Sequence, residues 1–155
     1  MSATSLNATD SLKQPRLLTA TILLVEDEPT VREVTREALE MGGYRVLEAS
    51  GPREAVRIAN DPSTPIDLLL TDVVMPEMSG PELARTICKS RPGMVTVFMS
   101  GYGESEVART PAHGVAHGHI QKPFTMYSLL SRVAQALATK WNTGSNPRPT
   151  QFPSL

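Results

Sequence analysis

Residues 66–76 read Ile66-Asp67-Leu68-Leu69-Leu70-Thr71-Asp72-Val73-Val74-Met75-Pro76, an apolar run that ends on the carboxylate of Asp72. The three consecutive leucines predict a buried strand, because a strand covered on both faces shows no alternation with polar residues. A carboxylate at the end of such a strand is costly unless a cation or hydrogen-bond donors lie near it. We therefore expect Asp72 to have a functional role.

Three further apolar runs also end on polar side chains. They are residues 21–25 before Glu26 and Asp27, residues 94–99 before Ser100, and residues 118–121 before Lys122. In an open parallel sheet, ligands bind at the edge formed by the carboxyl ends of the strands. Three carboxylates, a hydroxyl and an ammonium group are therefore expected to gather at one edge.

Helical patterns alternate with these strands. The helices are predicted over residues 29–41, 52–60, 79–90, 104–112 and 126–141, and a further strand over residues 44–50. In the first helix, apolar residues recur at helical spacing: Val31, Val34, Ala38, Leu39 and Met41. The fourth helix is poor, because Pro111 cuts it short. Five strands that alternate with helices predict an α/β fold, a doubly wound five-stranded parallel sheet in a single domain.

Length and charge exclude several classes of protein. The 155 residues are enough for one domain with its own core, and a formal net charge of −1 gives no electrostatic reason to bind nucleic acid or an anionic membrane. No apolar stretch approaches the roughly 18 residues that cross a bilayer, and the N-terminus lacks the apolar core of a secretion signal. The single cysteine, Cys88, fits a reducing compartment and is expected to be a structural thiol. We expect a cytoplasmic protein.

Composition also predicts the limits of the domain. Residues 1–19 are rich in Ser, Thr and Asn and are predicted to be a disordered N-terminal extension. Residues 142–155 are rich in Pro, Ser and Asn and are predicted to be a disordered tail. The folded domain is expected over residues 20–141.

The expected cluster of polar side chains suits phosphoryl transfer. Glu26, Asp27 and Asp72 would repel one another unless a cation lies among them, and oxygen ligands with an incomplete shell suit Mg²⁺. One carboxylate is then available as a nucleophile, since aspartyl phosphate formation is a known use of Asp. Ser100 offers a hydroxyl and Lys122 a positive charge to the oxygens of a phosphoryl group.

Four short motifs carry a resemblance to a known family. They are Ile22-Leu23-Leu24-Val25-Glu26-Asp27-Glu28; Leu70-Thr71-Asp72-Val73-Val74-Met75-Pro76 with Met78-Ser79-Gly80; Met99-Ser100-Gly101; and Gln121-Lys122-Pro123-Phe124. In this order and at these separations, they resemble the receiver domain of two-component response regulators over residues 20–140. The sequence around Ser100 and Lys122 looks most like that of receivers associated with hybrid sensor histidine kinases.

The resemblance implies a flavodoxin-like fold and a role as a phosphoacceptor rather than a turnover enzyme. Asp72 would accept a phosphoryl group from a sensor histidine kinase or a histidine phosphotransfer protein. Glu26, Asp27 and Asp72 would hold Mg²⁺ with the backbone carbonyl of Val74. Ser100 and Lys122 would contact the phosphoryl oxygens, and the Lys122–Pro123 bond would be cis. The chain would be either a free-standing receiver or a piece of a hybrid kinase.

His119 departs from the pattern of the family. The position three residues before the strand-end lysine is commonly Tyr or Phe, whose inward movement accompanies activation, so His119 is a candidate switch of a different character. Together with His113 and His117 it could suggest a metal site, but glycines interrupt the segment and no third-ligand motif supports zinc.

Three other functions are alternatives to the phosphoacceptor. A phosphatase with an Asp nucleophile would need a second aspartate two residues after Asp72, where the chain has Val74. A transcription factor is disfavoured because only about 15 residues follow the last predicted helix, too few for a DNA-binding helix-turn-helix module. A phosphorylation-independent adaptor with the same fold remains the alternative, although such a protein would be expected to lack one of Asp72, Asp27 and Lys122.

Overall fold

The computed structural model describes residues 19–101 and 116–142, without the side chains of residues 116, 117, 141 and 142. The predicted fourth helix and His113 lie outside the described residues, and so do nearly all of both predicted extensions. The side chain of His117 is likewise not described.

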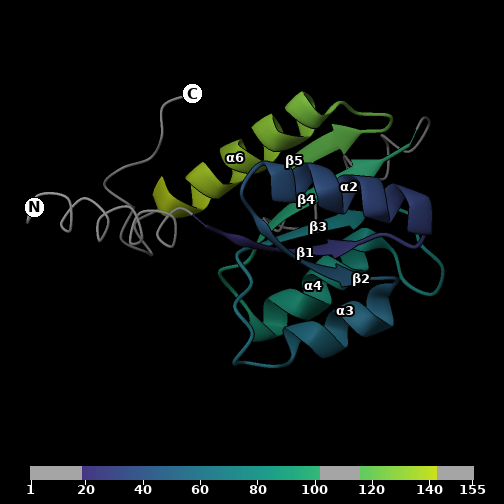
Figure 1. Ribbon diagram of the computed structural model, residues 1–155. Helices are drawn as coiled ribbons and strands as arrows, with labels where there is room; N and C mark the ends of the chain where they lie inside the picture. The colour runs from purple at the N-terminus through teal and green to yellow at the C-terminus, as the bar shows by residue number, and fades with distance from the viewer. Residues whose placement is uncertain (1–18, 102–115, 143–155) are drawn as a thin grey trace, which may run out of the picture.

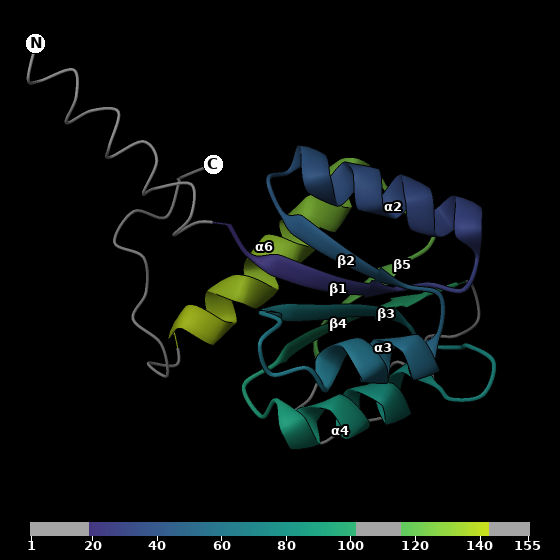
Figure 2. The same ribbon diagram turned by 60° about the horizontal axis from the view of Figure 1, so that its bottom comes forward.

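Five parallel strands form one sheet in the order β2-β1-β3-β4-β5, which confirms the predicted fold class. The strands are β1 (Thr21–Val25), β2 (Arg45–Ala49), β3 (Leu68–Asp72), β4 (Val95–Ser100) and β5 (Ala116–Gln121). The described helices are α2 (Pro29–Met41), α3 (Pro52–Ala59), α4 (Gly80–Ser90) and α6 (Met126–Asn142). Element bounds differ from the predicted ones by at most two residues. Helices α2 and α6 cover one face of the sheet, and α3 and α4 cover the other (Figures 1 and 2).

The apolar strands are buried on both faces, as their continuous leucines predict. Alternate residues of β1 and β3 point into two different clusters, so that Leu24 and Leu70 pack under α2 and α6, whereas Leu23 and Leu69 pack under α3 and α4. Strand β2 lies at one edge of the sheet and is only partly buried. The central strands therefore supply the rigid support on which the carboxyl edge is built.

Helix α2 differs from its predicted pattern. Val34 and Met41 are exposed, at 59% and 74%, and only Leu39 of the five recurring apolar residues is buried. The polar residue Thr35 takes an inward position, which it can do because its hydroxyl donates to the carbonyl of Val31 at 2.7 Å. Apolar spacing alone does not reveal a hydroxyl that is satisfied within its own helix.

Helix α4 begins with a capping box that fixes the loop after β3. The hydroxyl of Ser79 accepts from the backbone N–H of Glu82 at 3.2 Å, and the carboxylate of Glu82 accepts from the backbone N–H of Ser79 at 3.1 Å. Gly80 lies directly against the strand end, where a Cβ atom would come within 2.1 Å of the carbonyl oxygen of Asp72. A glycine is therefore needed for the helix to start this close to Asp72.

Candidate phosphoacceptor site

The register of the sheet explains why the predicted side chains meet. Val25 is paired with Thr71, so Glu26 emerges from β1 at the level of Asp72 at the end of β3. Asp72 is in turn paired with Met99, one residue before Ser100. Ser100 is paired with Gln121, one residue before Lys122. Each strand thus ends within one residue of its neighbour, and the polar residues that follow share one edge.

Glu26, Asp27 and Asp72 form a compact acidic cluster. One ligand oxygen from each carboxylate lies within 4.8 Å of the others. Glu26 and Asp72 are buried, at 1% and 4% exposure, whereas Asp27 is exposed. The cluster is therefore closed on the protein side and open to solvent at Asp27. A shallow cleft of about 440 Å³ adjoins Asp27 and is lined in part by Arg53 and Glu77.

Lys122 joins the two buried carboxylates. Its Nζ lies 2.8 Å from Oε1 of Glu26 and 2.6 Å from Oδ1 of Asp72, so it connects three strand ends that are far apart in the sequence. The Lys122–Pro123 peptide bond is cis, which confirms the expectation from the resemblance. The ammonium group thus lies where a phosphoryl group attached to Asp72 would need a positive charge.

The cluster strongly perturbs the ionisation of Asp72. Burial, and then the hydrogen bond with Glu26, raise the pKa of Asp72 to about 8, although Lys122 opposes the shift. Burial also acts to raise the pKa of Glu26, but hydrogen bonds with Asp72 and Lys122 outweigh it, and the pKa of Glu26 is lowered. Burial acts to lower the pKa of Lys122, but its two carboxylate partners raise it. Burial and the neighbouring Glu26 therefore favour the protonated form of Asp72 near neutral pH, in spite of Lys122.

This arrangement fits a hard divalent cation. The two buried carboxylates share one ammonium group, which does not balance the negative charge of the cluster. A dication among oxygen ligands would supply the missing charge, and the exposed position of Asp27 leaves room for water in the remaining coordination positions. Among the described residues, these three side chains meet the geometric requirement for a metal-binding group. Val74 lies in the loop two residues after Asp72, and the role of its carbonyl stays a prediction from the resemblance.

Ser100 is buried, and its hydroxyl is hydrogen-bonded to Nε2 of His119. The contact follows from the register, because Phe98 is paired with His119 and Ser100 lies one step towards the carboxyl edge on the same face. Burial, and then the nearby charge of Arg132, lower the pKa of His119. A lowered pKa favours the neutral ring, in which one of the two nitrogens carries no hydrogen and can accept a hydrogen bond. His119 was predicted as a candidate switch, but its direct bond to Ser100 was not predicted.

Sequence reasoning also missed two residues that shape the site. The guanidinium of Arg32 donates from Nη1 to the carbonyl oxygen of Glu26 at 2.7 Å. Gly80 packs against the backbone of Asp72. Arg32 lies one turn into a helix, where an arginine ordinarily faces water, so no local signal marked it. Gly80 belongs to one of the motifs that carry the resemblance, but its contact with the strand end depends on the fold.

Comparisons with known proteins agree with this geometry. The family model of the response regulator receiver domain matches residues 22–134. The chain is 41% identical over 118 residues to the sensor kinase CckA of Brucella abortus, covering 76% of this chain and 12% of that protein. It is 34% identical over 118 residues to the response regulator receiver protein CpdR of the same species, covering 75% of this chain and 95% of CpdR. This protein belongs to the response regulator receiver domain family.

A solved structure gives the same result. The receiver domain of the hybrid histidine kinase CckA superposes with a TM-score of 0.65 at 36% identity, over 76% of this chain and 99% of that domain. The predicted likeness to receivers of hybrid kinases is thereby confirmed. Because the chain spans only 12% of the length of CckA, the similarity concerns the receiver and not the rest of that kinase. No helix among the described residues is long and apolar enough to cross a membrane.

Proposed function

We propose that this chain is a phosphoacceptor switch of a two-component phosphorelay, which accepts a phosphoryl group on Asp72 in the presence of Mg²⁺. The observation that carries the proposal is the meeting of Asp72 with Glu26, Asp27 and Lys122 at the carboxyl edge of the sheet. The donor is the phosphohistidine of a sensor histidine kinase or of a histidine phosphotransfer protein. The folded unit is residues 20–141, and it acts in the cytoplasm.

Asp72 is the nucleophile in the proposed reaction. The positive charge of a bound cation would favour the ionised carboxylate of Asp72. One of its oxygens attacks the phosphorus atom, and an O–P bond forms as the P–N bond to the donor histidine breaks. The electron pair of the P–N bond remains on the imidazole, which leaves. The rigid end of β3, held by the Val73 N–H bond to the carbonyl of Met99 at 2.9 Å, keeps the carboxylate in place.

Lys122 and Ser100 act on the transferred group. The ammonium group of Lys122 already lies 2.6 Å from Asp72, so it pairs with a phosphoryl oxygen after transfer. The hydroxyl of Ser100 leaves Nε2 of His119 and donates to another phosphoryl oxygen. His119 is then released from its bond to Ser100, and this release is the proposed start of the conformational switch.

Mg²⁺ would be held by Glu26, Asp27 and Asp72, with the carbonyl of Val74, directly or through water. When bound, it neutralises negative charge on the carboxylates and on the incoming phosphoryl group. The protein contributes a buried pair, Glu26 and Asp72, and an exposed third ligand, Asp27. The product remains attached to Asp72, so the protein is a stoichiometric acceptor and not a turnover enzyme.

The proposal is tested by incubating the protein with radiolabelled acetyl phosphate in Mg²⁺ or in chelator. We expect up to one label per chain, stable to gel electrophoresis but released by hydroxylamine, only when Mg²⁺ is present. Asp72→Asn should take up no label, whereas Asp67→Asn, a matched change of an aspartate on the same segment outside the cluster, should label as the wild type does. Equal labelling of Asp72→Asn, or labelling in chelator at the full rate, would refute it.

A further inference from the structure

The β1–α2 loop, residues 26–28, carries two of the three carboxylates of the acidic cluster. Two of its contacts are local: the N–H of Glu28 donates to Oε2 of Glu26 at 3.1 Å, and the carboxylate of Glu28 caps α2 by accepting from Thr30 at 3.1 Å. A third contact comes from the next turn of α2, where Nη1 of Arg32 donates to the carbonyl of Glu26 at 2.7 Å. Arg32 therefore binds the main chain of a cluster residue and not its carboxylate.

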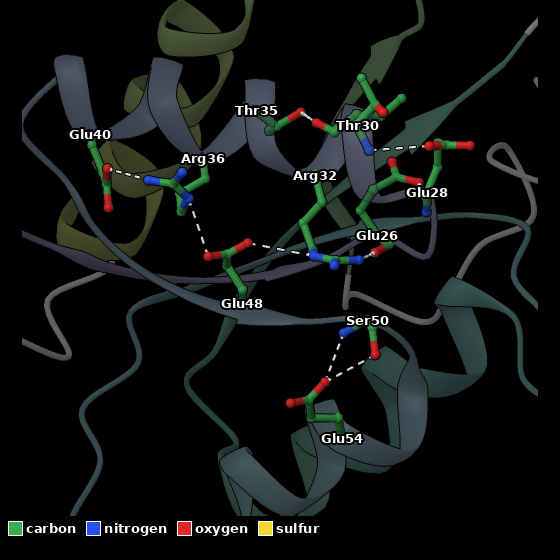
Figure 3. A network of polar contacts seen from close by, with 11 residues as sticks. Glu26, Glu28, Thr30, Arg32, Thr35, Arg36, Glu40, Glu48, Ser50 and Glu54 are labelled. Atoms are coloured by element: carbon green, nitrogen blue, oxygen red, sulfur yellow. Dashed lines mark hydrogen bonds and ion pairs between the residues drawn. The ribbon is translucent and has the colours of Figure 1, made fainter.

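Arg32 is itself held by the neighbouring strand β2. Its Nε lies 3.5 Å from Oε1 of Glu48, and Nε of Arg36 lies 3.2 Å from the other oxygen, Oε2, of the same carboxylate. Arg36 also pairs with Glu40 at 2.8 Å (Figure 3). The two arginines thus share Glu48, but in the described structure only Arg32 extends to the loop that carries the acidic cluster.

We propose that Arg32 is a positioning residue for the divalent cation, an inference that rests on the proposed function. Its planar guanidinium bridges the carbonyl of Glu26 and the carboxylate of Glu48, so the end of β1 is fixed relative to β2 and to α2. A fixed loop keeps Glu26 and Asp27 in place before the cation arrives, and less conformational freedom is lost on binding. Arg32 thereby raises the affinity for Mg²⁺ without contacting it.

The competing explanation is that Arg32 only tightens the surface of α2. Exposed ion pairs contribute little to stability, and the pairs of Arg32 and Arg36 with Glu48 are similarly accessible, with side-chain exposures of 20% and 27% for the arginines. A purely structural role therefore predicts similar effects for both arginines. A positioning role predicts that only Arg32 changes cation binding.

The test compares Arg32→Gln with the matched variant Arg36→Gln, in the full chain. Mg²⁺ titrations followed by calorimetry give the dissociation constant, and thermal unfolding in chelator gives the stability of each variant. We expect Arg32→Gln to weaken Mg²⁺ binding about tenfold, as is typical when a partner outside the metal ligands is removed, and Arg36→Gln to change it less than twofold. The two variants should differ little in Tm in chelator.

Arg32→Lys provides a second arm that keeps the charge. The single ammonium group of lysine cannot bridge the carbonyl of Glu26 and the carboxylate of Glu48 as the planar guanidinium does. The Mg²⁺ affinity of Arg32→Lys should therefore remain clearly below that of the wild type. Equal Mg²⁺ affinities in the wild type and Arg32→Gln, or equal losses in Arg32→Gln and Arg36→Gln, would overturn the positioning role and leave the phosphoacceptor function intact. A wild-type protein that binds no Mg²⁺ would overturn both.

Discussion

Replacement of Asp72 by Asn should stabilise the cation-free protein. The pKa of Asp72 is raised to about 8 in the folded protein, from an ordinary value of 3.8. Between these two pH values the folded protein binds a proton that the unfolded chain releases. The free energy of unfolding of the wild type therefore falls as pH rises from about 4 to about 8, and the Asn variant, which has no such group, does not share this loss.

The size of the effect follows from the shift. One pKa unit corresponds to about 1.4 kcal/mol, so the shift of Asp72 taken alone would cost about 4 kcal/mol at pH 7. Two other groups offset part of this loss of stability in the wild type. The lowered pKa of Glu26 and the raised pKa of Lys122 both mean that the folded state favours their ionised forms. Asn also loses the ion pair with Lys122. We expect a net gain of about 1–3 kcal/mol at pH 7, or roughly 4–12 °C in Tm.

The assay is urea unfolding of both proteins in chelator between pH 4.5 and pH 8. The difference in the free energy of unfolding should be small at the lowest pH and should grow towards the highest. Saturating Mg²⁺ should stabilise the wild type but not the Asn variant, since the variant has lost a ligand. A variant that is less stable than the wild type throughout, or a gain that does not change with pH, would refute the argument that the raised pKa of Asp72 costs stability.

Three further changes test other parts of the site. Asp27→Ala should abolish Mg²⁺ binding and leave the protein slightly more stable in chelator, because one repelling carboxylate is gone; a clear loss of stability would show that Asp27 is a structural cap instead. Gly80→Ala should lower the free energy of unfolding by about 2 kcal/mol or more, because its Cβ would lie 2.1 Å from the carbonyl oxygen of Asp72. The control Gly93→Ala, with nothing within 4 Å of its Cβ, should be close to neutral in the same urea unfolding assay. The pKa of His119, lowered by burial and Arg132, should rise when a beryllofluoride mimic draws the hydroxyl of Ser100 away and adds negative charge nearby. An identical pKa in an NMR titration of both states would remove His119 from the switch.

The strand ends of this protein could be predicted from its sequence because their signal is local. Apolar runs that stop at Glu26, Asp72, Ser100 and Lys122 indicate both the parallel sheet and the edge where these side chains meet. The order and the register in which the strands pair come from the structure. The geometry of the site confirms that these residues lie together, while their roles in phosphoryl transfer remain predictions.

Contacts between elements could not be predicted in the same way. Arg32 reaches the carbonyl of Glu26 through a long side chain, and nothing in the spacing of α2 distinguishes it from Arg36, which pairs with Glu48 and Glu40 instead. The bond between Ser100 and His119 depends on the exact register of β4 and β5. Thr35 is buried in place of Val34 because an internal hydrogen bond offsets the cost of its hydroxyl. Each of these depends on three-dimensional detail that apolar periodicity does not contain.

The most direct test of the phosphoacceptor is to locate the phosphoryl group. The protein is phosphorylated with acetyl phosphate and Mg²⁺, and the acyl phosphate is reduced with borohydride, which converts a phosphorylated aspartate into homoserine. Peptide mapping by mass spectrometry should find homoserine at position 72 and no conversion in a sample treated with chelator. Homoserine at another aspartate, such as Asp27, or an absence of conversion at Asp72 in a protein that binds Mg²⁺, would contradict the assignment.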